Sequence, residues 1–94
     1  MAHLFIKHKV ADYTAWKKTF DEFVETRRAG GEKSFQILHP ENEPNNLYLM
    51  FEWDSIANAQ KFLDSSELKN AMQEAGVTEE PQISFLNEYD KGML

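Results

Sequence analysis

The 94-residue sequence contains no cysteine. This absence excludes disulfide bonds, a catalytic thiol and zinc sites with thiolate ligands. Three histidines are present, but their expected positions are not adjacent on neighbouring strands, and no carboxylate lies at a spacing that would complete a ligand set. We therefore predict no metal site.

Positive charge and long apolar runs are also scarce. The chain has ten Lys and Arg residues and sixteen Asp and Glu residues, so its net charge is −6. This negative charge argues against nucleic acid and anionic membranes as partners. The longest apolar run is far shorter than the roughly 20 residues of a membrane span. Lys7 and Lys9 interrupt the N-terminal apolar stretch, so a secretory signal is not expected. These features predict a soluble, cytoplasmic protein.

The remaining composition is that of a globular protein. Hydrophobic residues make up 41% and aromatic residues 13% of the chain, enough for one folded domain over residues 1–94. A chain of this length buries only about two-thirds of its unfolded surface. A second copy of the chain would therefore help to complete its core.

The segment Leu47–Trp53, which reads L-Y-L-M-F-E-W, is the longest mostly apolar run. It is rich in strand-favouring residues, and its large side chains alternate between both faces of the predicted strand. We therefore expect this strand to lie centrally in a sheet, with both of its faces covered.

Periodicity predicts the other elements. Apolar and polar residues alternate in strands, and apolar residues three or four positions apart mark one side of a helix. The predicted strands span residues 3–10, 32–39, 47–53 and 82–89, and the predicted helices span 13–29, 56–63 and 67–75. Asp12 is the expected N-cap of the first helix, and Asp54 or Ser55 that of the second.

This order of elements predicts an α+β, ferredoxin-like split βαβ fold. Right-handed crossovers give the strand order 4-1-3-2 in a four-stranded, antiparallel-rich sheet with the helices on one face. The opposite face would carry Phe5, Tyr48, Met50 and Leu86. Because an open apolar face of this kind is adhesive, we expect two sheets to pack face to face in a homodimer, as a dimeric α/β barrel.

Four segments carry a resemblance to a known family: H-K-V-A-D-Y-T-A-W-K-K-T-F-D at 8–21, F-E-W-D at 51–54, S-S-E-L-K-N-A-M-Q-E-A-G-V at 65–77 and P-Q-I-S-F-L at 81–86. They resemble small stand-alone proteins of the dimeric α/β-barrel superfamily, labelled antibiotic-biosynthesis-monooxygenase-like. The resemblance extends over nearly the whole chain. It implies one of three activities: cofactor-free oxygenation of polyketides, oxidation of quinols or degradation of haem.

The haem-degrading members of this superfamily use an asparagine on the first strand, a tryptophan at the end of the third and a histidine on the second helix. Trp53 matches the tryptophan, but the other two residues are missing from the corresponding elements. Haem degradation is therefore not expected, and no cofactor is predicted.

We expect the first and third strands to be parallel neighbours, with their C-terminal ends beside the starts of both helices. This arrangement predicts a mostly apolar pocket between sheet and helices. His8 is the candidate catalytic residue, since it alone could move a proton near neutral pH. The candidate substrate-binding residues are Trp53, Trp16, Tyr13, Phe35 and Phe51.

Other interpretations of these residues stay open. A histidine bonded to a neighbour and two tryptophans packed in the core would account for His8, Trp16 and Trp53 without any ligand. A second pocket could open where His39, Asn87 and Tyr89 are expected to meet. Arg27 and Arg28 near a helix C-terminus could hold an anion, although they also complement the helix dipole.

Two functions fit the sequence. One is a cofactor-independent monooxygenase, an oxidoreductase that acts on a small aromatic or quinol-like compound. The other is a non-catalytic dimer that binds a small apolar ligand or a partner protein. The fold alone does not choose between them, because one fold supports many activities.

Overall fold

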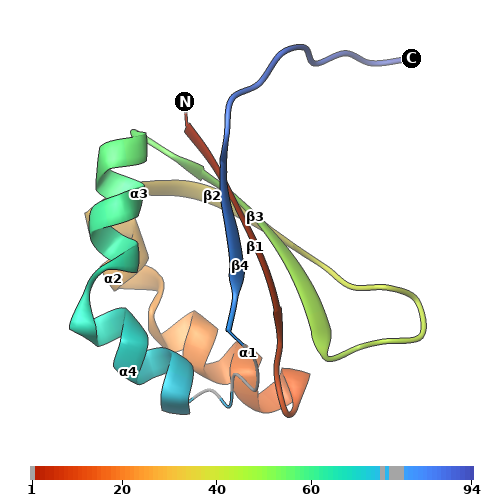
Figure 1. Cartoon of the computed structure of the whole chain (residues 1–94), viewed down its shortest axis with the longest axis vertical. Coiled ribbons are helices and arrows are strands. Elements are labelled where there is room, and N and C mark those ends of the chain that lie inside the picture. The colour runs from red at the N-terminus through yellow and green to blue at the C-terminus, as the bar shows by residue number, and fades with distance from the viewer. Residues whose placement is uncertain (1, 75, 77–79) are drawn as a thin grey trace.

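The computed structural model describes residues 2–74, 76 and 80–94. Within them, the chain forms four strands and four helices (Figure 1). They are β1 (Ala2–Lys9), α1 (Tyr13–Glu22), α2 (Val24–Gly30), β2 (Glu32–Leu38), β3 (Asn46–Trp53), α3 (Ile56–Leu63), α4 (Ser66–Glu74) and β4 (Gln82–Leu86).

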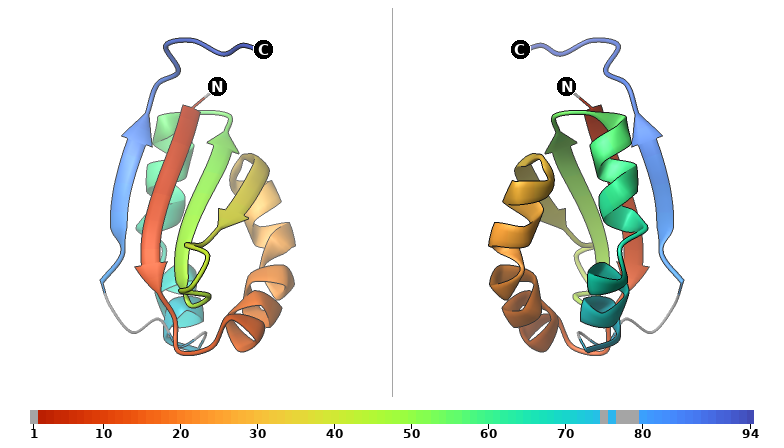
Figure 2. Two further views of the ribbon diagram at one scale, coloured as in Figure 1. Left: turned by 90° about the vertical axis from the view of Figure 1, so that its right-hand side faces the viewer. Right: turned by 90° about the vertical axis from the view of Figure 1, so that its left-hand side faces the viewer.

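The strands form one antiparallel sheet in the order β2-β3-β1-β4, which confirms the predicted topology. All four helices cover the same face of the sheet, and the other face is open (Figures 1 and 2). The fold is the expected α+β, ferredoxin-like one. β3 lies between β1 and β2, as its apolar sequence predicted.

The expected parallel pairing of β1 with β3 is wrong. The two strands are antiparallel, with Ala2 opposite Trp53 and His8 opposite Leu47. The helical crossover through α1 and α2 makes β2 run in the same direction as β1, and the loop over residues 39–45 then reverses the chain into β3. His8 and Trp53 therefore lie toward opposite ends of the sheet, and not side by side.

The predicted helix over residues 13–29 is interrupted. The chain forms α1 and α2 with a break at Phe23, whose backbone leaves the helical conformation. Asp12 caps α1 as predicted, since its carboxylate accepts a hydrogen bond from the Ala15 backbone N–H over 2.9 Å. Ser55, and not Asp54, caps α3 by accepting the Asn58 backbone N–H over 3.1 Å.

The helical residues after β3 form two helices, α3 and α4, with the break that the sequence predicted. Ser65 accepts a hydrogen bond from the Leu68 backbone N–H over 3.2 Å, and this contact marks the start of α4 after the break. The predicted end of this helix, Ala75, lies outside the described residues.

The last strand is shorter than the predicted range 82–89. β4 pairs only with β1, and Leu86 already lies opposite His3, one residue from the start of β1. The backbone beyond Leu86 has no neighbouring strand to bond. Residues 87–94 therefore lie outside regular structure, and the Tyr89 side chain is fully exposed.

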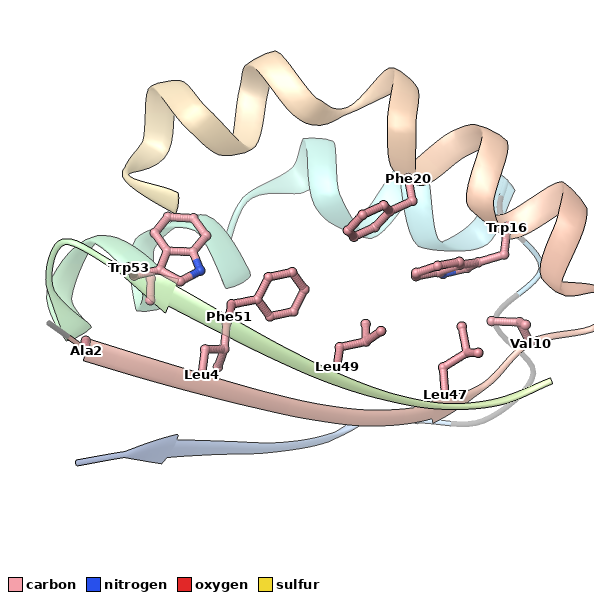
Figure 3. Close-up of a cluster of buried hydrophobic side chains, with 10 residues drawn as sticks. Ala2, Leu4, Val10, Trp16, Phe20, Leu47, Leu49, Phe51 and Trp53 are labelled. Atoms are coloured by element: carbon pink, nitrogen blue, oxygen red, sulfur yellow. The ribbon is translucent and has the colours of Figure 1, made fainter. Parts of the chain in front are cut away.

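The core lies between the sheet and the helices (Figure 3). Its strand residues alternate with outward-facing ones, as the period of a strand requires. The buried side chains include Leu4, Leu47, Leu49, Phe51 and Trp53 from the sheet and Trp16, Phe20 and Ala59 from the helices. This layer also forms the walls of the candidate site.

Gly31 joins α2 to β2 in a conformation that favours glycine. Its φ angle is +124°, and a Cβ atom there would approach the Asp54 carboxylate to 2.5 Å. We expect Gly31→Ala to lower the free energy of unfolding by about 1–3 kcal/mol because the backbone would be strained. Urea unfolding followed by circular dichroism measures this change.

Gly92 provides the matched control. A Cβ atom there would have no heavy atom within 4 Å, so Gly92→Ala should leave the unfolding midpoint unchanged. Equal midpoints for the two variants would contradict the conformation described for Gly31.

Candidate functional site

A cavity of about 120 Å³ lies between the helices and the helix-facing side of the sheet. Its walls are almost entirely apolar. The polar lining residues are His8, Thr19, Arg27 and Glu32; the sheet adds Leu4, Ile6, Leu49, Phe51, Trp53 and Ile83, and the rest of the lining is Trp16, Phe20, Phe23, Phe62, Leu63, Leu68, Ala71, Met72 and Pro81. The polar groups therefore stand out against an apolar background.

His8 lies toward one end of the cavity. Its side chain is buried, and its ring meets the Trp16 indole edge to face, with 5.7 Å between the centroids. Neither ring nitrogen has a hydrogen-bond partner among the described residues. Burial lowers the pKa of His8 from 6.5 to about 4, so the imidazole is neutral at pH 7. A neutral imidazole can accept a hydrogen bond or a proton from a ligand.

Aromatic rings continue from His8 along the helix side of the cavity. Trp16 stacks on Phe20 with 4.8 Å between the ring centroids, and Phe20 meets Phe51 at 6.3 Å. Aromatic contacts of this kind add about 0.5–1.5 kcal/mol beyond the area they bury. They hold the walls of the cavity in place.

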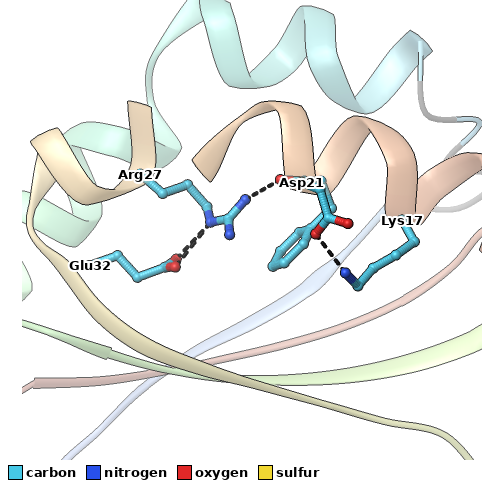
Figure 4. Close-up of polar contacts among 5 residues, drawn as sticks. Lys17, Asp21, Arg27 and Glu32 are labelled. Atoms are coloured by element: carbon cyan, nitrogen blue, oxygen red, sulfur yellow. Dashed lines mark hydrogen bonds and ion pairs between the residues drawn. The ribbon is translucent and has the colours of Figure 1, made fainter. Parts of the chain in front are cut away.

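An ion pair occupies the other part of the cavity wall (Figure 4). Arg27 Nε donates to both carboxylate oxygens of Glu32 over 3.1 and 3.0 Å, and Arg27 Nη1 donates to the Phe20 backbone carbonyl. The guanidinium carbon lies 3.7 Å from the centroid of the Phe20 ring. Arg27 and Glu32 are both buried, so this pair is a fixed part of the interior.

The electrostatics of Glu32 follow from that burial. Removal from water raises the pKa of the Glu32 carboxyl, and the hydrogen bond and the positive charge of Arg27 oppose this shift. The net direction is upward, because desolvation outweighs the partner. Glu32 thus holds its proton at a higher pH than an exposed glutamate does.

Trp53 lies beside this ion pair. It is directly opposite Glu32 in the pairing of β2 with β3, and its indole packs on Phe62 with 5.2 Å between the centroids. Its Nε1–H group is buried and has no acceptor among the described residues. In Figure 3 the indole nitrogen points to the interior, toward Phe51.

The structure brings four of the six predicted site residues to the cavity wall: His8, Trp16, Phe51 and Trp53. Tyr13 lies behind Trp16, with 6.0 Å between the ring centroids. Phe35 contacts the Phe20 ring edge to face, but 44% of it is exposed, and it lines a separate hollow at the sheet edge. Tyr13 and Phe35 are therefore not part of this cavity.

The second predicted pocket does not form. His39 follows β2, near the end of the sheet where β1 finishes, whereas Asn87 and Tyr89 follow β4, near the start of β1. These residues also lie on opposite edges of the sheet, since β2 and β4 are its two outer strands. His39 Nδ1 instead lies 2.7 Å from the Pro40 carbonyl oxygen.

Arg27 and Glu32 are the functional candidates that the sequence analysis missed. The sequence offered Arg27, with Arg28, as a possible anion-binding group that also complements the helix dipole, and Glu32 only as the start of a strand. The sequence offers a weak signal, an arginine in the last turn of a helix and a glutamate five residues later across a glycine pair. Only packing shows that both side chains turn inward.

The described residues offer neither a metal-binding cluster nor a helix that could span a membrane. Residues 2–74, 76 and 80–94 hold no group of three or more His, Asp or Glu side chains that could bind a metal ion. Over the same residues, no helix has the length and apolar character needed to cross a membrane.

The family model for antibiotic biosynthesis monooxygenases matches residues 1–74. The chain belongs to this family. The match covers β1 to α4, and therefore every cavity residue except Pro81 and Ile83. Among curated proteins, none matches the sequence significantly.

Solved structures of similar fold agree with this assignment. SnoaB, a cofactor-independent oxygenase from Streptomyces nogalater, has a TM-score of 0.77 at 10% identity and covers 96% of this chain and 94% of its own. A putative antibiotic biosynthesis monooxygenase from Caulobacter crescentus CB15 has a TM-score of 0.73 at 16% identity, covering 95% and 90%. At these identities the likeness shows the shared fold.

The lowered pKa of His8 predicts a pH-dependent stability. Between pH 6.5 and 4 the unfolded chain binds a proton at His8 that the folded protein does not. The free energy of unfolding should therefore fall as the pH decreases through this range, by about 3 kcal/mol at most. His8→Phe should remove this contribution, which urea unfolding of both proteins from pH 7 to 4 would measure.

His39→Phe is the control, because His39 is an exposed histidine of the same chain. It should retain the pH dependence of the unaltered protein. A pH dependence in His8→Phe equal to that of the unaltered protein would contradict the burial of a neutral imidazole.

Proposed function

We propose that this protein is a cofactor-independent monooxygenase that acts on a small aromatic, quinol-like compound. One observation carries the proposal: a neutral imidazole without a hydrogen-bond partner, His8, lies among aromatic rings in an apolar cavity. An imidazole in this state can take up the hydroxyl proton of an aromatic ligand. Membership of the antibiotic biosynthesis monooxygenase family supports the reaction type.

The cavity volume limits the size of the substrate. An engineered protein cavity of about 150 Å³ is known to bind benzene, and the cavity described above measures about 120 Å³. A single aromatic ring is therefore the largest ring system that this cavity accommodates without rearrangement. Among quinols, a one-ring hydroquinone meets this limit best.

In the proposed reaction, the hydroxyl of a hydroquinone donates its proton to His8 and leaves an electron-rich phenolate. The ring carbon next to that oxygen transfers an electron to O₂ and then forms a C–O bond, which gives a hydroperoxide. Cleavage of its O–O bond releases water and leaves a hydroxyquinone. One oxygen atom enters the ring and the other enters water, and the substrate supplies all the electrons, so no separate reductant is required.

The low basicity of His8 is compatible with this step. An isolated imidazole with a pKa near 4 is a weak base toward a phenol. However, the phenolate that forms beside it is an opposite charge in a medium of low dielectric, and such a charge raises the pKa of a histidine. Proton transfer therefore becomes more favourable as the ion pair forms.

A non-catalytic ligand-binding function is the second candidate. It is favoured by the position of the other ionisable groups of the cavity, Arg27 and Glu32, which lie near Trp53 at the far end from His8. His8 thus has no second acid–base group beside it among the described lining residues. A protein that only binds an aromatic ligand would need none.

Oxygen uptake with methylhydroquinone tests the enzymatic proposal. His8→Phe should lower kcat by about 100-fold or more, the usual effect of removing a general base, because it removes the proton acceptor and keeps a ring in place. His3→Gln, on the opposite face of β1, is the control and should keep the rate. Uptake that equals spontaneous oxidation in buffer, with saturable binding of the quinol, would instead favour the ligand-binding function.

We further propose that the open face of the sheet packs against a second copy of the chain. Phe5, Tyr48 and Met50 alternate with core residues on β1 and β3, so they lie on this face. A two-fold axis between the two sheets and perpendicular to the strands would bring the Lys7 end of one copy over the Glu52 end of the other. Apolar contacts in the middle and opposite charges at both ends make the face complementary to itself.

Light scattering tests the homodimer. The unaltered protein should have twice the chain mass, and Met50→Glu should reduce it to a monomer, because a carboxylate would be buried in the interface. Lys18→Glu on the exposed surface of α1 changes charge in the same direction and should stay dimeric. A monomeric unaltered protein at micromolar concentration would rule out this interface.

A further inference from the structure

We propose that Arg27 and Trp53 form a binding subsite for a phenolate oxygen of the aromatic ligand. This inference deepens the function proposed above by naming the group that the far end of the cavity recognises. Its basis is a pair of buried N–H donors that line the cavity and have no acceptor among the described residues: Arg27 Nη2 and Trp53 Nε1.

The other contacts of Arg27 hold its guanidinium in a fixed position. Only 3% of the residue is exposed, and Nε and Nη1 are already used by Glu32 and the Phe20 carbonyl. These bonds and the Phe20 ring 3.7 Å from the guanidinium carbon fix the plane of the group. In Figure 4 the remaining nitrogen points to neither Glu32 nor the Phe20 carbonyl but toward the sheet. Its position is set before any ligand binds.

The sheet places Trp53 opposite Glu32, the residue that binds this arginine. Trp53 and Glu32 are directly opposite each other on neighbouring strands, which separates their Cα atoms by about 5 Å. Glu32 in turn holds the Arg27 guanidinium. Trp53 is also close to α2, since a Cβ atom on Gly30 would lie 3.4 Å from the indole ring. Both donors thus belong to the same end of the cavity.

The two donors determine the kind of ligand atom. A buried N–H group without an acceptor costs stability, and an oxygen that accepts both N–H groups recovers this loss on binding. The positive charge of Arg27 favours an oxygen with negative charge, and the apolar walls favour an aromatic ring behind it. A phenolate, whose charge is partly spread over its ring, meets both requirements.

The charged and titratable groups of this cavity are His8, Arg27 and Glu32 among the described lining residues. Glu32 opposes a bound anion when it is ionised. Burial raises the pKa of Glu32, so its carboxyl stays neutral to a higher pH and repels the anion less. The subsite should therefore bind a phenolate better below the pKa of Glu32 than above it.

4-Nitrophenol is a suitable probe because it has one ring and its phenolate is yellow. We expect the unaltered protein to bind it saturably, with quenching of tryptophan fluorescence, and to lower the pKa of the bound phenol by about one unit or more, as a nearby positive charge does. The absorbance of the bound phenolate over a pH series measures this shift. The measurement does not depend on reaction with oxygen.

The test variant is Arg27→Met with Glu32→Met. Replacing both members avoids leaving a buried carboxylate unpaired, and two apolar side chains of similar size preserve the packing. In this variant the pKa of bound 4-nitrophenol should rise above that of the free compound, because the positive charge is gone and the apolar walls disfavour the phenolate. Arg28→Met changes a neighbouring arginine that is exposed and paired with Glu25, and it should behave as the unaltered protein.

Trp53→Phe tests the second donor, since it removes the N–H group and keeps an aromatic ring. It should weaken binding about tenfold, the effect of one hydrogen bond to a charged group, and leave the sign of the pKa shift unchanged. An unshifted pKa in the unaltered protein, or the same shift in the double variant, would overturn the assignment of Arg27. Absence of saturable binding would overturn it as well.

The outcomes separate this subsite from the proposed reaction. A lowered phenol pKa without oxygen uptake supports the subsite and argues for a protein that only binds its ligand. Oxygen uptake that depends on His8, together with an unshifted phenol pKa, supports the oxygenase and overturns the subsite.

Discussion

The antiparallel pairing of β1 with β3 is the constraint on which the site depends. It places His8 opposite Leu47 and Ala2 opposite Trp53, so the histidine and the tryptophan stand at opposite ends of one cavity. A ligand that enters this space meets a neutral base near one end and two N–H donors near the other. The pairing thus keeps the His8 imidazole apart from the N–H groups of Arg27 and Trp53.

The polar groups of this cavity reduce the stability of the fold. His8, the free end of Arg27 and the Trp53 indole N–H are buried without partners among the described residues, although buried polar groups in proteins are normally bonded. The packing around them is otherwise regular, with stacked aromatic rings and capped helices. Among the described residues, Asn46 Oδ1 is also buried without a partner, and the other such atoms belong to residues that line this one cavity. A binding site would produce such a concentration, because sites are where local stability is given up for function.

The sequence predicted most of the fold and part of the site. Apolar residues at every second position located the strands, and apolar residues three or four positions apart located the helical segments. These spacings arise because one face of a strand or helix must bury apolar side chains. The same patterns correctly turned His8, Phe51 and Trp53 toward the helices and Trp16 toward the sheet. Their arrangement was predicted wrongly, because a face assignment does not specify strand direction. Tyr13 and Phe35 share the right face as well but lie outside the cavity.

By itself the sequence determined the elements, the strand order and the apolar character of the interior, because these follow from local periodicity and from the handedness of crossovers. Tertiary structure alone decided which polar groups meet. Arg27 contacts Glu32 because α2 ends above the start of β2, and Trp53 joins them through the pairing of β2 with β3. These contacts join three separate elements, and no local pattern encodes the distance between them.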